Sequence, residues 1–348
     1  MFFYAGMGVL KYMSKRIKII AFAILFSAGT TLSTVAQTSD IRGLQTSLQD
    51  FSGDLAKALP FNASLGLNWA DAYIGRLFPS IPPRLGAGVA LGFTTMDLPA
   101  MKALTNSLGY TIPNDSEKLI FPAYTIETRL GGILFPWDLG FKFGYLPYRE
   151  FPGNNVDTYS LIAGGDVRFS VLDGKTNLAL PNISIGLGVN YLRGGIEGYS
   201  NMSRSISFGS ASLNLSNPDV NLLWNTFALD LKAQISKSLL IFTPYLGVGG
   251  SFAWSSAGYS VSAPVTVNGA PINQTHINEI NSQLRSNGLV GMTLSPSGIS
   301  STSKNSGYNL RAYGGSSINF LIFRLDLTAL YSFLDGNYGA SLGLRIQF

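Results

Sequence analysis

The last eleven residues of the chain, 338–348, read YGASLGLRIQF and alternate strictly between two kinds of side chain. Successive side chains of an extended strand point to opposite faces, so this stretch has one apolar face and one face of small or polar residues. The apolar face carries Tyr338, Ala340, Leu342, Leu344, Ile346 and Phe348. The pattern runs to the final residue and predicts a β-strand whose two sides meet different surroundings.

The same period of two governs most of the chain from Arg84 onward. Further segments alternate large apolar residues with glycine or polar residues, as strands with two unlike faces do. These segments are 84–93, 124–130, 139–145, 159–169, 183–191, 223–233, 240–254, 308–318 and 325–333. With the C-terminal strand they predict about ten strands in all. Twelve is the alternative, with a strand added from residues 62–71 or from a loop, because bacterial membrane barrels close with even numbers.

The predicted connections alternate in length. Tight ones are expected at residues 135–138, 236–238 and 321–322, a moderate one at 173–181, and long ones at about 96–120, 150–156, 196–220 and 255–306, with a short last turn at 335–337. Short turns on one side and long loops on the other are typical of transmembrane barrels, and interfacial aromatics form girdles at their rims. The candidate girdle residues are Tyr145, Tyr159, Tyr191, Trp254, Tyr308 and Tyr338. We therefore predict an all-β fold, a transmembrane antiparallel up-and-down β-barrel. A charged fraction of only 12% agrees with a wall that has one face in lipid.

The terminal aromatic after alternating apolar residues resembles the C-terminal assembly signal of bacterial outer-membrane β-barrel proteins. The resemblance implies that Tyr338, Leu342, Leu344, Ile346 and Phe348 form this signal. It also implies that the barrel assembly machinery and outer-membrane lipid are partners, and that the protein lies in the outer membrane of a diderm bacterium.

The first 36 residues are predicted to be a secretory signal peptide. Lys15, Arg16 and Lys18 form a basic region, an apolar run follows at 19–26, and 34–36 offer a cleavage site of small residues. Met13 directly precedes the basic region and is the alternative start. Removing this segment leaves 20 of the 24 basic residues against 19 acids. The basic balance of the whole chain is therefore no evidence for a nucleic-acid partner.

Residues 37–83 are expected to form an N-terminal helix and a plug-like segment ahead of the barrel at 84–348. Apolar residues recur at helical spacing over about 41–59, Asp40 can cap the start, and Pro60 is expected to end the helix. The helix either plugs the lumen or lies in the periplasm against the base of the barrel. A plug before the strands is similar to the long-chain fatty-acid channel family, in architecture only. That resemblance implies transport of a hydrophobic substrate as one alternative.

Charged residues recur on the polar faces of the predicted strands, often two residues apart. A charge near the middle of the bilayer costs about 2–4 kcal/mol, so these faces are expected to line the lumen. The predicted lumen-facing charges are Arg84, Glu127, Arg129, Lys142, Asp166, Arg168, Asp230, Lys232, Arg311, Arg324, Asp326 and Arg345. They form either a structural ion-pair network that fills a narrow barrel or the lining of an anion-selective pore.

Chemistry beyond the lumen charges has little support in the sequence. There is no cysteine, and the one histidine, His276, lies in a long loop near Glu279. We expect a solvated loop histidine on a short helix ended by Gly288, with no catalytic residue, no metal site and no cofactor. A second loop helix is expected at 97–109.

The expected function is a narrow or plugged porin-like channel for small solutes. The alternatives are a structural or adhesin-like surface barrel without transport, or a hydrophobic-substrate transporter.

Overall fold

The protein is described by a computed structural model. It describes residues 38–97, 118–150, 156–174, 180–199, 204–208, 211–215, 219–262, 265–267, 270–286, 292–296 and 298–348.

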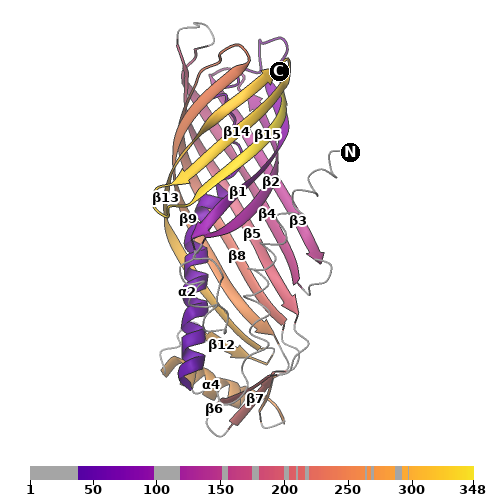
Figure 1. Ribbon diagram of the computed structural model, residues 1–348, viewed down its shortest axis with the longest axis vertical. Coiled ribbons are helices and arrows are strands. Elements are labelled where there is room, and N and C mark those ends of the chain that lie inside the picture. The colour runs from indigo at the N-terminus through magenta and orange to yellow at the C-terminus, as the bar shows by residue number, and fades with distance from the viewer. Residues whose placement is uncertain are drawn as a thin grey trace.

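Ten antiparallel strands close into a barrel (Figure 1). They are β1 (Leu85–Asp97), β2 (Lys118–Gly131), β3 (Trp137–Glu150), β4 (Val156–Leu172), β5 (Asn182–Tyr199), β8 (Asp219–Ser236), β9 (Phe242–Ser262), β13 (Gly298–Phe320), β14 (Phe323–Ser332) and β15 (Tyr338–Gln347). Each strand pairs with the next one in this order, β9 pairs with β13, and β15 closes the ring on β1. The prediction of about ten strands is confirmed. The alternative of twelve is wrong.

The barrel has two unlike ends. At one end, called the turn end, short connections join β2 to β3, β4 to β5, β8 to β9 and β13 to β14, and the C-terminus lies there as well. The other end is called the loop end. It carries a small sheet of β6 (Arg204–Phe208), β7 (Ala211–Leu215), β10 (Val265–Val267) and β11 (Ala270–Pro271), together with α4 (Gln274–Ser286) and β12 (Met292–Ser295).

An apolar band covers the outer surface of the wall. On β9 the outward residues run from Phe242 to Trp254 and are mostly large and apolar, whereas Ser256, Ser260 and Ser262 follow beyond Trp254. Phe252 lies between Trp254 and Tyr308 of β13, with ring centroids 4.7 and 4.9 Å away. Aromatic residues at this height are what the edge of a membrane-embedded band requires.

The wall continues beyond the band on one side. Residues 255–306 were expected to be a loop, but β9 reaches Ser262 and β13 begins at Gly298, which is its partner in the ladder. The outward residues of this extension, such as Thr302 and Lys304, are polar because they face water. A strand that is polar on its outer face has no apolar alternation, so the sequence pattern does not show where it ends. Its length is set by pairing with residues far along the chain.

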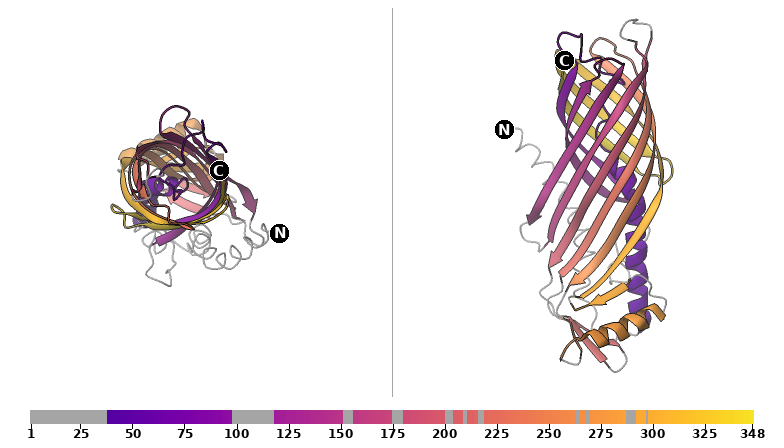
Figure 2. Two further views of the ribbon diagram at one scale, coloured as in Figure 1. Left: turned by 90° about the horizontal axis from the view of Figure 1, so that it is seen from above. Right: turned by 180° about the vertical axis from the view of Figure 1, so that it is seen from behind.

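The later part of the helix α2 (Thr38–Ala63) lies inside the ring of strands, and its start extends to the loop end beside α4 (Figure 2). Of the two expected placements, the plug in the lumen is correct. The prediction that Pro60 ends the helix is wrong, since α2 continues for one more turn. A proline inside a helix removes one hydrogen bond. Here the neighbouring Leu59, Phe61 and Ala63 are each 0% exposed, so burial offsets that loss.

Residues 64–76 follow α2 through the lumen without forming a strand, and residues 77–83 continue at the turn end. Residues 62–71 were considered as a strand because apolar residues alternate there. The structure places both sets of side chains in the interior, since Ser64 and Asn68 are as buried as Leu65 and Trp69. Gly66 and Leu67 also have positive φ angles, of 90° and 59°, which an extended strand does not have.

The helices within the described ranges include no segment long and apolar enough to cross a membrane.

Candidate functional site: the occupied lumen

The lumen divides into two parts with different linings. In the loop half, residues 51–63 of α2 occupy the lumen and contact apolar wall residues. In the turn half, residues 64–76 occupy it and contact mostly charged and polar wall residues, although Leu65 and Ala70 also pack against Tyr245, Tyr313 and Leu330. The two parts meet at the end of α2, where Lys142 of β3 donates hydrogen bonds to the carbonyl oxygens of Ala63 and Leu65, at 2.8 and 2.6 Å.

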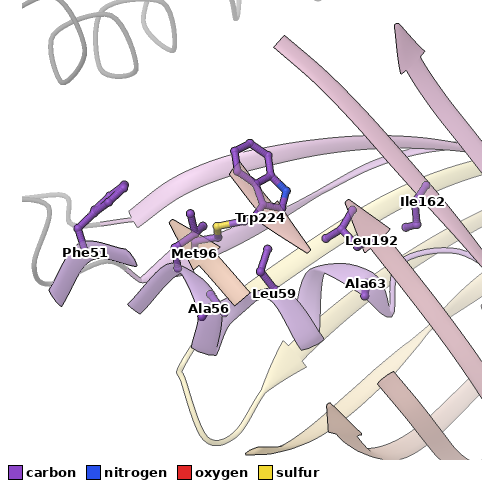
Figure 3. Close-up of a cluster of buried hydrophobic side chains, with 11 residues drawn as sticks. Phe51, Ala56, Leu59, Ala63, Met96, Ile162, Leu192 and Trp224 are labelled. Carbon is purple, nitrogen blue, oxygen red and sulfur yellow. The ribbon is translucent and has the colours of Figure 1, made fainter. Parts of the chain in front are cut away.

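An apolar cluster fills the loop half (Figure 3). Phe51, Leu55, Ala56 and Leu59 on one side of α2 pack against the inner wall. The wall residues of the cluster come from β1, β4, β5, β8 and β9, and are Met96, Ile162, Leu192, Trp224 and Ala257. The indole of Trp224 also meets Phe121 of β2 edge to face, with the ring centroids 5.9 Å apart. The cluster leaves these apolar side chains in contact with one another rather than with water.

Asp138 of β3 lies at the centre of the ion pairs in the turn half. Its carboxylate accepts hydrogen bonds from Arg129 at 2.6 Å and from Arg168 at 2.8 and 2.9 Å. The Asp138 side chain is 0% exposed. Arg129 also contacts Asp166, at 2.8 Å, and Asp166 in turn pairs with Lys232.

Three further ion pairs belong to this lining. Arg311 of β13 donates two hydrogen bonds to Asp230 of β8, at 2.8 and 2.7 Å. Arg345 of β15 contacts Asp326 of β14 at 2.5 Å and reaches Asp71 of the plug at 3.0 Å. In all these pairs the wall charges are almost completely buried.

The structure brings together most of the charges that the sequence places in the lumen, but not as neighbours on one strand. The carboxylates at positions 127, 166, 230 and 326 each bind a group from another strand or from the plug. Residues on adjacent strands come within about 4.5–5.5 Å, which is closer than the roughly 7 Å between residues two apart on one strand. Arg84 and Arg324 differ from the others, because both are only partly buried near the turn end.

The wall binds the main chain of the plug along most of its path. Lys232 donates to the carbonyl of Leu67, and Tyr245 to that of Asn68. Gln234 donates to the next two carbonyls, of Trp69 and Ala70, at 2.8 and 3.1 Å. Further along, Arg168 donates to the carbonyl of Asp71, Ser236 accepts from the amide of Ala72, and Asp138 accepts from the amide of Ile74. Buried peptide groups need such partners, and here side chains of the wall provide them.

Trp69 joins the plug to the wall through its side chain. Its indole N–H donates to Glu127 Oε2 at 2.7 Å. The guanidinium carbons of Arg345 and Arg129 lie 4.4 and 5.6 Å from the ring centroid, which are cation–π distances. One aromatic residue thereby satisfies an acid and contacts two buried bases.

Three central residues of the turn half were missed by sequence reasoning. Asp138 was assigned to a turn, although it shares the inward parity of Lys142 on the same strand and could have been found by extending that alternation by two positions. Trp69 and Asp71 belong to a segment without regular structure, where the alternation of apolar residues does not correspond to two faces.

The space left in the turn half is small. A cavity of about 20 Å³ is lined by Trp69, Glu127, Asp326 and Arg345 among others, and a second of about 10 Å³ lies beside Asp166 and Lys232. A site of this size holds about one water molecule. Neither cavity can accommodate a solute.

The loop end carries the only histidine. His276 and Glu279 are exposed on α4, while Ile277 is buried, so the predicted short helix is confirmed. Within the described ranges, no group of three metal-ligating side chains occurs. The helix expected at 97–109 lies outside the described residues.

The proposed assembly-signal residues lie on the outer surface of β15. Tyr338, Leu342, Leu344, Ile346 and Phe348 are all exposed there. The amide of Phe348 donates to the carbonyl of Leu85 at 2.9 Å, which holds the last residue on the neighbouring strand.

Comparisons with known proteins give structural matches only. No protein-family model and no curated protein matches the chain. Among solved structures, the chain is similar to the translocator domain of the autotransporter NalP from Neisseria meningitidis, with 10% identity, 87% of this chain and 97% of that chain covered, and a TM-score of 0.33. It is similar to a Pseudomonas aeruginosa FadL homologue, with 8% identity, coverage of 76% and 90%, and a TM-score of 0.25. The Ralstonia pickettii toluene transporter TbuX matches with 10% identity, coverage of 76% and 89%, and a TM-score of 0.25.

The outer surface and the closed ring together show the setting of the molecule. Large apolar side chains lie exposed on the outward faces of all ten strands. Closure pairs the backbone of every strand on both sides, which a strand in lipid requires. The chain is therefore a closed antiparallel β-barrel whose apolar outer face suits a membrane.

Proposed function

We propose that this protein is a sealed surface barrel, which passes no solute while its plug is in place and contacts partners through its loop end. The observation that carries the proposal is the set of bonds between residues 63–74 and the wall in the turn half. These bonds hold the plug at many successive peptide groups, and the two cavities beside it have room for about one water molecule each. A porin needs a continuous aqueous path through the lumen, whereas narrow barrels are filled by protein.

The loop end supports the second part of the proposal. The extension of β9 and β13 presents Lys304, Thr302 and Ser300 outward beyond the apolar band. Helix α4 exposes Gln274 and Asn278, which also bond to each other at 3.0 Å. This polar surface stands clear of the lipid and is suited to contact with water-soluble partners. The proposal gives His276 and Glu279 no catalytic role.

Conductance in a planar bilayer tests the sealed state. The intact protein should show conductance near zero. A deletion of residues 38–60 should stay closed, because it removes most of α2 and leaves the plug of the turn half. A deletion of residues 38–76 should open the lumen. A large conductance of the intact protein would contradict the proposal.

A plugged channel for small solutes is the second candidate function. The plug is one continuous segment, joined to the wall covalently only where the chain enters β1. If it leaves the lumen, the wall exposes Arg129, Arg168 and Arg311 with other bases, and the bases outnumber the acids even without Arg84 and Arg324. The deletion of residues 38–76 should then show anion preference, and Arg168→Ala should weaken it. In this geometry α2 itself fills the apolar half of the lumen, so a hydrophobic-substrate transporter is the less favoured alternative.

Two further proposals concern biogenesis. Residues 1–36 are proposed as the signal peptide, 37–83 as the plug segment and 84–348 as the barrel. The outward face of β15 is proposed as the signal that the assembly machinery reads. Deletion of Phe348 should lower the amount of heat-modifiable protein in the membrane, and Gln347→Ala, a change on the inward face, serves as the control. Normal insertion without Phe348 would refute the assignment.

A further inference from the structure

The plug crosses the barrel once and in one direction. Just past its middle, α2 is still near the outer end of β13, because a Cβ added at Gly53 would lie 3.6 Å from the Ser303 hydroxyl. Near its finish, the plug reaches the turn end, where Leu77 donates to the carbonyl of Gly132. β1 then begins at that same end. The described start of α2 therefore lies at the loop end, beside α4 (Figure 1).

The length of the helix makes this crossing complete. A helix of 26 residues extends about 39 Å at 1.5 Å per residue, and the extended segment after it adds to that length. The hydrocarbon core is about 30 Å thick. A plug that only closed the lumen could enter and leave at the turn end as a hairpin. This plug instead connects the two sides of the membrane.

The wall recognises the plug mainly through its peptide groups. Lys142, Gln234, Tyr245 and Arg168 all donate to main-chain carbonyl oxygens, and none of these bonds depends on the identity of the plug side chain. Carbonyls are present at every residue of a polypeptide. The same donors would therefore fit other residues of the chain as they occupied the same place.

We propose that the barrel carries its own N-terminal segment through the lumen to the cell surface, and that the inner wall of the turn half is a binding track for an extended polypeptide. The occupant is residues 38–76 of this chain, which arrive from the periplasm, where tight turns of outer-membrane barrels lie. The inference shares with the proposed function only the occupied lumen. A barrel can be sealed with its N-terminus on either side, so failure of one does not entail failure of the other.

Thiol labelling on intact cells tests the direction. The chain has no cysteine, so each introduced one is unique. With a membrane-impermeant maleimide, Gln49→Cys on the exposed face of α2 should label, as should Ser282→Cys on α4. Ser52→Cys is the matched control, because Ser52 lies on the same helix but is buried, and it should label only after denaturation. Ser238→Cys at the turn end should label only after the outer membrane is permeabilised.

The opposite pattern would overturn the proposal. If Gln49→Cys labelled only after permeabilisation, together with Ser238→Cys, the N-terminal segment would have stayed in the periplasm. If it failed to label even then, while Ser282→Cys labelled, the exposed face assigned to α2 would be wrong, and the proposal would fall with it.

An epitope placed directly before Thr38 gives a second, independent measurement. It should be bound by antibody on intact cells and removed by external protease, while the barrel stays resistant. The same epitope inserted at Leu240, which is 99% exposed at the turn end, is the control and should stay protected. Protection of the epitope before Thr38 in folded, heat-modifiable protein would refute export of this segment.

Discussion

The turn half and the loop half of the lumen are filled by one continuous segment but are stabilised differently. In the turn half, ion pairs around Asp138 and hydrogen bonds to peptide groups hold residues 64–76. In the loop half, Leu55 and Leu59 are buried against apolar wall residues, and no direction is imposed on their contacts. Hydrogen bonds and ion pairs demand particular atoms at particular distances, whereas apolar burial is roughly proportional to area. The turn half therefore sets the register of the plug, and the loop half adds stabilisation that tolerates adjustment.

This difference also predicts how each half responds to a mutation. Removing one partner of a buried ion pair leaves the other charge without compensation, which is much worse than losing both. Removing a buried methyl group leaves a cavity, and the surroundings partly relax into it.

Asp138→Ala should cause the largest loss. It leaves Arg129 and Arg168 without their shared carboxylate in a site that water does not reach. We expect a loss of about 3–5 kcal/mol in the free energy of unfolding, measured by denaturant titration in lipid vesicles. A loss below about 1 kcal/mol, as for a screened surface pair, would show that the turn half is wet.

Leu59→Ala should have a smaller effect, and a more local one. Leu59 is 0% exposed in the apolar cluster, so truncation should cost about 2–5 kcal/mol of plug docking, toward the lower end if α2 shifts to fill the space. The labelling rate of Ser52→Cys reports this docking and should rise, while the conductance stays near zero because the turn half is intact. Opening of the lumen in this variant would mean that the loop half makes the seal.

Lys142→Met tests the contribution of the hydrogen bonds to the plug separately from that of the ion pairs. The change keeps a long side chain but removes the donor to the carbonyls of Ala63 and Leu65. Loss of a charged hydrogen bond is expected to cost about 1–3 kcal/mol, again seen in faster labelling of Ser52→Cys. An unchanged rate would indicate that these carbonyls find other partners, and that the junction of the halves contributes little.

Lys57→Ala should have the smallest effect and serves as the reference. Lys57 lies 3.7 Å from Asp54 on α2, and its side chain is 64% exposed. An exposed pair of this spacing contributes about 0.5 kcal/mol or less, so unfolding and labelling should hardly change. A large change in unfolding free energy or labelling rate would imply that charges on α2 contribute to stability even when they are exposed. The proposed difference between the turn half and the loop half would then be wrong.

Sequence reasoning was strongest where the environment repeats. The apolar band forces the same alternation on every strand, and the strands from 84 onward, the tight turn at residues 321–322 and the outward face of β15 all follow from it. It was weaker where water lies on the outer face, as at residues 255–262 of β9. There polar side chains are equally acceptable in a loop or a strand, and the pairing partner at residues 298–307 is far along the chain.

The pattern of side chains was enough to determine a closed barrel with its lipid face, its polar inner face and an amphipathic helix ahead of it, because each of these depends on local periodicity against one kind of solvent. Only the tertiary structure decided that the helix fills the lumen, that it points toward the loop end, and that Trp69 and Asp71 meet Arg345. These features depend on which distant groups come within hydrogen-bonding distance once the ring has closed. Sequence periodicity does not predict such distances, because in a segment without regular structure a side chain can point to any side of the lumen.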